Sequence, residues 1–427
     1  MVSSPHPALG RLHAVVLYVG AVLGSGVLIV PALAADLAGP ASIMAWIAMA
    51  IAALPMALTM STLAARFPGG GGVSTFVEQA FGSGAGAFVG WLFLLAIPFG
   101  APISTFVAAA YAVSAFGLPA RAVGPLAAAL LAGVLAVNYR GMRAAAWLQV
   151  GVVGAVAALL AVAVAGGAWH VRVEHFTPFA PHGIVGVGRA AAILFWSFIG
   201  WEAVTHLSGE FRDPRRDLVP AVSIAAAIIT VLYVGTAVVT VGTGSYGGGR
   251  SAASLVLVMR AALGPAAGWA TGILALACVS AMLVTYLGGA ASLARSLAQR
   301  GLAPAFLGAA NAVGAPAGGL LAIGVLGGGV LVALVSNASS LQTLILLPSA
   351  SFIAVYLLGT AAGVKLAPSR GEAGMAWFAF ATSALVYPFL GWGALYPLVV
   401  AIPAWLTARR RQRAATGSVA ESHSASV

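Results

Sequence analysis

The chain has 427 residues, of which 61% are hydrophobic and only 7% are charged. Apolar runs of about twenty residues, the length that a helix needs to cross a bilayer, recur from end to end. This composition excludes a soluble domain and predicts an all-α polytopic membrane protein with a single domain, residues 1–427. The net charge is +11, and the distribution of the positive residues along the chain matches the predicted membrane topology. No nucleic acid partner is therefore expected.

The apolar runs predict twelve transmembrane helices. Their approximate ranges are 14–36, 41–63, 85–116, 122–138, 144–168, 186–208, 218–242, 265–290, 317–336, 341–363, 374–390 and 391–408. The tail at 409–427 begins with an arginine cluster and continues with small polar residues. Such a tail is expected to be disordered on the cytoplasmic side, with its basic part near anionic headgroups.

The basic residues predict the orientation in the membrane. With the N-terminus inside, fifteen of the 20 lysines and arginines fall in cytoplasmic connections and tails, and five fall on the opposite side. Positive residues are enriched in cytoplasmic loops. Both termini are therefore expected in the cytoplasm.

The first apolar run is interrupted at its middle by Gly24-Ser25-Gly26. A glycine inside a helix costs roughly 1 kcal/mol relative to alanine, and an amide freed within a bilayer must find another partner. The sixth run carries Gly200 at its middle and Glu202 just beyond it. Paired interruptions at corresponding positions of two halves are the best sequence indication of inverted repeats around a site at the membrane midplane.

These interruptions predict two five-helix repeats, at 14–168 and 186–363, followed by helices 11 and 12 at 374–408. Pro98 and Pro102 lie within the third run. Each proline removes one backbone hydrogen bond and bends its helix. A bent helix at this place is able to line a cavity.

Three stretches together resemble the amino acid, polyamine and organocation (APC) transporter superfamily over nearly the whole chain: GAVLGSGVLIVPALAA, RFPGGGGVSTFVEQAFG and WSFIGWEAVTHLSGEFRDPRRDLVPA. The runs GWLFLLAIPFGAP and GEFRDPRRD are most similar to bacterial exporters of L-methionine and branched-chain amino acids. The resemblance implies a LeuT-like fold of twelve helices, with an inverted five-helix repeat and broken helices 1 and 6. It also implies alternating access, secondary transport without ATP, and a place in the bacterial plasma (inner) membrane.

The resemblance also implies where an amino acid substrate binds. Main-chain amides at the first break, with a serine hydroxyl, would take the α-carboxylate because a half-helix N-terminus carries partial positive charge. Carbonyls at the second break would accept from the α-ammonium, and a tryptophan would close over the substrate as a gate. The implied substrate-binding residues are Gly24, Ser25, Gly26, Trp196, Phe198 and Ile199.

The substrate is expected to be a neutral apolar amino acid such as methionine, leucine, isoleucine or valine. No aspartate or lysine lies near the middle of the third, eighth or tenth predicted helix, so the side-chain pocket is expected to lack a fixed charge. An importer or exchanger on the same fold, and a membrane sensor that does not transport, stay open as alternatives.

Protons are the expected coupling ion, through Glu202 and His206. A charged acid at mid-membrane costs about 2.5–3.5 kcal/mol, so such residues face the bundle interior and are commonly functional. On one α-helix Glu202, His206 and Glu210 would share a face as a relay. The alternative is structural: Glu202 bonds a freed amide at the break and His206 only packs or meets interfacial water.

Sodium coupling has weaker support, because Ser280 and Thr285 are the only hydroxyls that we can nominate near the eighth helix. Asp36, near the outer end of the first helix, is expected to be a solvated helix-end residue. The glycine-rich loops lack the lysine and hydroxyl residue that end a phosphate-binding loop. We therefore expect no enzymatic activity, no cofactor and no metal site, with substrate, protons and membrane lipids as partners.

Overall fold

The computed structural model describes residues 10–68, 72–141, 146–248 and 250–407, without the side chains of 146–150, 206, 207, 209 and 210. Every regular element within these ranges is a helix, as predicted. The α-helices are α1 (Arg11–Val22), α2 (Gly26–Ala38), α3 (Ser42–Arg66), α4 (Val73–Phe81), α5 (Ser83–Phe116), α6 (Val123–Tyr139), α7 (Ala146–Ala168), α8 (Gly183–Leu194), α9 (Pro214–Gly242), α10 (Ser254–Leu263), α11 (Pro265–Gln299), α12 (Ala317–Val335), α13 (Leu341–Leu366) and α14 (Arg370–Val386). The short 3-10 helices are η1 (Gly39–Ala41), η2 (Ala120–Ala122), η3 (Val173–Phe176), η4 (Phe195–Phe198), η5 (Ala203–Glu210), η6 (Arg250–Ala253), η7 (Ala305–Gly308) and η8 (Tyr387–Leu395).

The described residues hold ten helical stretches that are long and apolar enough to cross a membrane, and the shorter apolar helix α1 precedes them. Two of these stretches, Gly26–Arg66 and Arg370–Thr407, have 41 and 38 residues. Each is divided by a 3-10 segment, η1 in the first and η8 in the second. The multi-pass membrane class is thereby confirmed, and the number of twelve crossings stays a prediction. The predicted tail at 409–427 lies outside the described residues.

Glycines and prolines set where several helices begin and end. α9 begins at Pro214, whose missing N–H costs nothing in a first turn, and the Asp213 side chain accepts a hydrogen bond from the Arg216 amide. Gly82 and Gly264 have φ angles of +92° and +83°, which residues with a Cβ rarely adopt. At each of these glycines a short helix ends and a long one begins at the next residue.

The order of elements is therefore similar in the two halves of the chain. The short α4 of 9 residues precedes α5 of 34, and the short α10 of 10 residues precedes α11 of 35. In each half a broken helix and one long helix come first, and two further long helices come last. This correspondence supports the predicted repeats at 14–168 and 186–363, which stay a prediction.

Both predicted breaks are present in the backbone. α1 ends at Val22 and α2 begins at Gly26. In the sixth segment α8 passes into η4, Ile199 is extended, and Gly200 has a φ of +129°. A Cβ at Gly200 would lie 2.5 Å from the carbonyl oxygen of Ala21, so glycine lets the two breaks approach each other.

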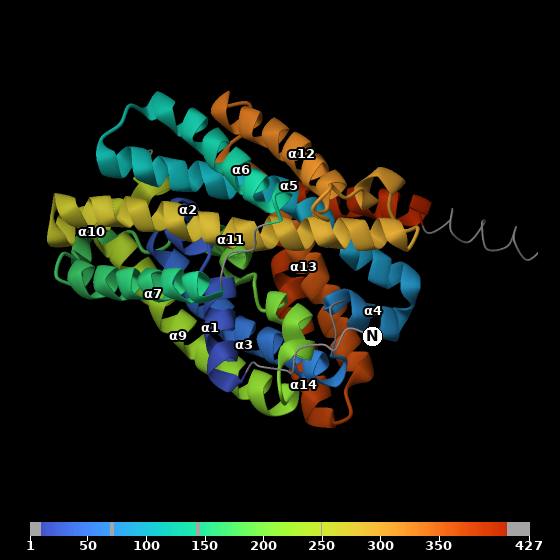
Figure 1. The fold of residues 1–427 in the computed structure, drawn as a ribbon. Coiled ribbons are helices and arrows are strands. Elements are labelled where there is room, and N and C mark those ends of the chain that lie inside the picture. The colour runs from blue at the N-terminus through green and yellow to red at the C-terminus, as the bar shows by residue number, and fades with distance from the viewer. Residues whose placement is uncertain (1–9, 69–71, 142–145, 249, 408–427) are drawn as a thin grey trace, which may run out of the picture.

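Long helices surround these breaks (Figure 1). α5 and α11, the two longest helices, pack along each other, and α13 packs on α5. α9 packs against both α1 and α3, on the side where the first break lies. The broken segments are thus held in the interior of the helix bundle.

Candidate functional site

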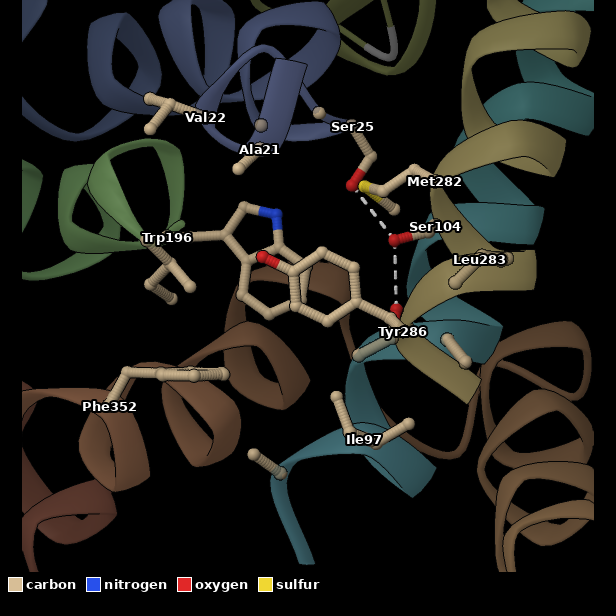
Figure 2. A pocket seen from close by; sticks show the side chains of 16 residues that line it. Ala21, Val22, Ser25, Ile97, Ser104, Trp196, Met282, Leu283, Tyr286 and Phe352 are labelled. Atoms are coloured by element: carbon tan, nitrogen blue, oxygen red, sulfur yellow. Dashed lines mark hydrogen bonds between the residues drawn. The ribbon is translucent and has the colours of Figure 1, made fainter. Parts of the chain in front are cut away.

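A cavity lies where the two breaks meet (Figure 2). Its volume is about 50 Å³, smaller than the range of about 300–1,000 Å³ typical of small-molecule sites. Its walls come from both breaks and from α5, α11 and α13. The lining residues are Ala21, Val22, Gly24, Ser25, Gly26, Ala96, Ile97, Gly100, Ala101, Ser104, Trp196, Ile199, Met282, Leu283, Tyr286 and Phe352.

The first break leaves main-chain donors without partners. Within the described chain, the amides of Ser25, Gly26 and Val27 donate no hydrogen bond, and no side chain caps the start of α2. Ser25, Gly26 and Val27 are all buried. Buried amides are almost always paired, so this cluster at a helix N-terminus is suited to an anionic group.

The second break leaves main-chain acceptors without partners. The carbonyl oxygens of Phe198 and Ile199 accept no hydrogen bond from any described residue. The Ile199 side chain lines the cavity. The Phe198 side chain packs elsewhere, with its ring 5.9 Å from that of Trp46 and 5.5 Å from that of Tyr233. Phe198 is not among the residues that line the cavity, so Ile199 is the residue of this pair that borders it.

Trp196 forms one wall of the cavity, opposite α5. A Cβ at Gly100 would lie 2.7 Å from Cη2 of the indole ring, so glycine at this position makes room for the tryptophan. The ring is partly exposed and packs on a small cluster formed by Ala96, Ile199 and Phe352. This position next to the break is the one expected of the predicted gate.

Gly26 lies where the two broken segments come into contact. A Cβ there would lie 2.8 Å from both Cα and Oγ of Ser197, in the sixth segment. The Tyr233 hydroxyl of α9 joins the same two segments, since it donates to the Val22 carbonyl at 2.6 Å and is also 3.1 Å from the Ser197 carbonyl. Gly26 is therefore needed first for close contact between the broken segments.

The remaining walls are mostly apolar. Among the described lining residues none is charged, and side-chain polarity comes from Ser25, Ser104, Tyr286 and the Trp196 indole. The sequence indicated the α5 wall through its two prolines. It gave no comparable signal for Tyr286 on α11 or Phe352 on α13, because their position depends on how those helices rotate toward the breaks.

Glu202 is completely buried beside the second break. Its Oε2 accepts hydrogen bonds from the Gly200 amide at 2.9 Å and the Tyr356 hydroxyl at 2.6 Å. Its Oε1 has no partner in the described part of the molecule. The contact with a freed amide matches the structural alternative for Glu202, while the second oxygen stays available to a proton.

The predicted relay from Glu202 through His206 to Glu210 needs correction. The segment is the 3-10 helix η5 rather than an α-helix, and with three residues per turn, positions four apart do not share a face. The side chains of His206 and Glu210 lie outside those that the structure describes.

The hydroxyls nominated for sodium do not line the cavity. Ser280 lies in a separate groove between α6 and α11, and the Thr285 hydroxyl donates to the Ala281 carbonyl of its own helix. No group of three or more potential metal-ligating side chains occurs in the ranges described.

Asp36 is a partly exposed residue near the end of α2, as expected, but its carboxylate also has partners within the protein. Its Oδ1 accepts a hydrogen bond from the Gly247 amide at 2.9 Å, and its carboxylate also contacts the Ser251 side chain. Partial burial and the nearby Asp36 carboxylate raise the pKa of Tyr246 in the same loop. Asp36 thus attaches α2 to the connection between α9 and α10.

Comparison with known proteins agrees with this architecture. A sequence model described as amino acid permease matches residues 9–413. The uncharacterized amino acid permease YecA of Bacillus subtilis is 35% identical over 388 residues, which cover 90% of this chain and 91% of that protein.

A second relative has a more specific name. The L-methionine/branched-chain amino acid exporter YjeH of Escherichia coli is 32% identical over 416 residues, covering 96% of this chain and 98% of that protein. The branched-chain amino acid permease BcaP of Bacillus subtilis is 28% identical over 259 residues, covering 55% and 54% of the two chains. The chain therefore belongs to the amino acid permease family of the APC superfamily, as a multi-pass membrane protein that transports amino acids.

Proposed function

We propose that this protein is a secondary transporter that exports neutral apolar amino acids, such as methionine, leucine, isoleucine and valine, by proton antiport with alternating access. The six binding residues and the two repeats expected from the sequence are part of this proposal. So are the location in a bacterial plasma (inner) membrane and the cytoplasmic position of both termini.

One observation carries the proposal: residues with unpaired amides and a residue with an unpaired carbonyl border the same cavity. The donor residues that line the cavity are Ser25 and Gly26, at the start of α2, and the acceptor residue that lines it is Ile199. A zwitterionic α-amino acid carries an acceptor and a donor group on one carbon atom. Its carboxylate complements the amides, and its ammonium complements the carbonyls.

The walls favour an apolar side chain. Ile97, Met282 and Phe352 offer dispersion contacts, and the described lining residues provide no charged partner for arginine, lysine or glutamate. Burying an unpaired charge costs far more than these contacts return. The name of the Escherichia coli relative supports the same substrate class.

Glu202 is the proposed proton-binding group. It lies two residues beyond Gly200 and bonds that residue's amide, so a change in its proton occupancy acts directly on the second break. Tyr356 on α13 shares the same carboxylate oxygen. Binding or loss of a proton is thus able to alter how the sixth segment packs on its neighbours. His206 stays a second candidate for this role by its sequence position.

Transport in proteoliposomes tests the proposal. Purified protein is reconstituted, and fluxes of radiolabelled L-methionine and L-leucine are measured under an imposed pH gradient, an imposed sodium gradient and neither. We expect an opposing proton gradient to stimulate the flux of both amino acids. L-arginine and L-glutamate serve as charged controls and are expected to compete weakly.

The other outcomes have definite meanings. Stimulation by unlabelled amino acid on the opposite side, without any effect of a proton gradient, identifies an exchanger and contradicts antiport. Proton-driven accumulation in the direction of the gradient identifies an importer. Binding without flux under every gradient identifies a sensor.

A further inference from the structure

We propose that Ser104 of α5 is a positioning residue for the substrate carboxylate, acting through the hydroxyl of Ser25. The inference rests on the proposed function, because it assumes that an amino acid carboxylate binds at the first break. Ser104 is not among the residues that the sequence motifs indicate.

The two hydroxyls form a short chain at the edge of the cavity (Figure 2). Ser25 Oγ lies 2.8 Å from Ser104 Oγ, and Ser104 Oγ lies 2.9 Å from the Gly100 carbonyl oxygen. Both serines line the cavity and both are at least 98% buried. The chain therefore connects the first break to the helix that forms the facing wall.

The number of hydroxyl protons determines the direction of hydrogen-bond donation between Ser25, Ser104 and Gly100 in the empty site. Each hydroxyl has one proton to donate and can accept at its oxygen. If Ser104 donates to Gly100, Ser25 donates to Ser104, and both contacts are hydrogen bonds. If Ser104 donated to Ser25 instead, its contact with the Gly100 carbonyl would lose its proton. The first arrangement makes more hydrogen bonds and is the one that we assign.

Arrival of a carboxylate reverses the direction without moving either oxygen. Ser25 turns its proton to the carboxylate, forming a charge-assisted hydrogen bond. Ser104 then rotates its proton from Gly100 to the Ser25 oxygen, and Gly100 keeps its place within the hydrogen-bonded main chain of α5. Ser104 thus holds the Ser25 oxygen in one place in both states and polarises its O–H toward the carboxylate.

Thr105, the next residue of α5, provides a matched control. Its hydroxyl is also fully buried and donates to the Pro102 carbonyl of the same helix at 3.0 Å. It is absent from the cavity lining. Ser104→Ala and Thr105→Val each remove one buried hydroxyl from α5, but only the first removes a partner of Ser25.

The test is equilibrium binding of L-methionine to the purified full-length protein and to four variants: Ser25→Ala, Ser104→Ala, the double variant, and Thr105→Val. Ser104→Ala removes the Ser25–Ser104 bond from the empty protein and from the complex alike, so its effect comes from lost positioning and polarisation of the Ser25 hydroxyl. We expect an increase in Kd of about 3- to 10-fold. Thr105→Val is expected within about 2-fold of wild type. The double variant is expected within about 2-fold of Ser25→Ala, because a residue that acts through Ser25 has no effect once that hydroxyl is gone.

Three results overturn the inference: an unchanged Kd in Ser104→Ala, additive losses in the double variant, or an equal loss in Thr105→Val. If Ser104→Ala does not fold, Ser104→Thr decides, since it keeps a hydroxyl and is expected to bind within about 2-fold of wild type; a loss of about 10-fold there also refutes the inference. Wild-type protein that binds neither L-methionine nor L-leucine contradicts the proposed function itself, and the inference fails with it.

Discussion

A methyl group added at Gly26 tests whether contact between the two breaks supports the site. In Gly26→Ala the new Cβ would lie 2.8 Å from Ser197 Cα, whereas ordinary contacts begin at 3.4 Å. The segments must therefore separate by about 0.6 Å, the difference between those two distances. Neither contact atom is the end of a long flexible side chain, so this displacement falls on the main chain.

Overpacking of this kind costs about 1–3 kcal/mol. If the whole cost is expressed in the bound state, the Kd for L-methionine rises by about 5- to 140-fold. If part of it is expressed in the empty protein, the thermal unfolding temperature falls and the Kd changes less. We expect both changes together, because the displaced amides of α2 belong to the site and to the fold.

The assay pairs L-methionine binding with thermal unfolding of the same purified samples. Gly154→Ala on α7 is the control, since a Cβ there would meet nothing within 4 Å. That variant is expected to match wild type in both measurements. Normal affinity and normal unfolding temperature in Gly26→Ala would refute the reasoning, because the two breaks would then tolerate separation.

Three further substitutions test other parts of the account. Glu202→Gln keeps an acceptor for the Gly200 amide and the Tyr356 hydroxyl, so we expect L-methionine affinity within about 2-fold of wild type. The pH profile of proteoliposome flux is expected to flatten. An unchanged profile would leave Glu202 with a structural role only. Tyr233→Phe leaves the Val22 carbonyl without its side-chain donor and should lower the free energy of unfolding by about 1–3 kcal/mol in denaturation experiments; equal stability would contradict the assigned contact. Asp36→Ala removes the attachment of α2 to the loop between α9 and α10 and should lower the free energy of unfolding by only about 0.5–1.5 kcal/mol. Proteases should also cleave that loop faster. Unaltered cleavage would contradict the attachment.

Much of the fold was predictable because membrane helices are recognised in a sequence by their length and hydrophobicity. Most predicted ranges overlap the described helices, although α11 extends nine residues beyond the predicted 265–290 and α10 was not predicted. Both breaks occur where glycine interrupts an apolar run. Gly24 and Gly200 were informative because a glycine in the middle of a membrane helix is costly and needs a reason.

The errors arose where tertiary contacts decide the outcome. The spacing of Glu202 and His206 suggested a shared α-helical face, but the chain beyond Gly200 continues as a 3-10 helix. The partners of Asp36 were missed because the Gly247 amide lies 211 residues away in the sequence. Ser104 carried no signal at all, since its importance depends on the rotation of a bent helix toward the first break.

Cys278, the single cysteine of the chain, is buried on α11 with its Sγ 3.6 Å from the carbonyl oxygen of Leu23. A maleimide is not expected to reach this thiol, because the residue is only 5% exposed, so the natural chain already serves as an unreactive background for thiol chemistry. One engineered cysteine at any surface position would then be the sole attachment point for a spin label or a dye. Labelling of Cys278 itself would report exposure of this buried thiol, as expected if the first break moves away from α11, which gives the protein a built-in probe of its own opening.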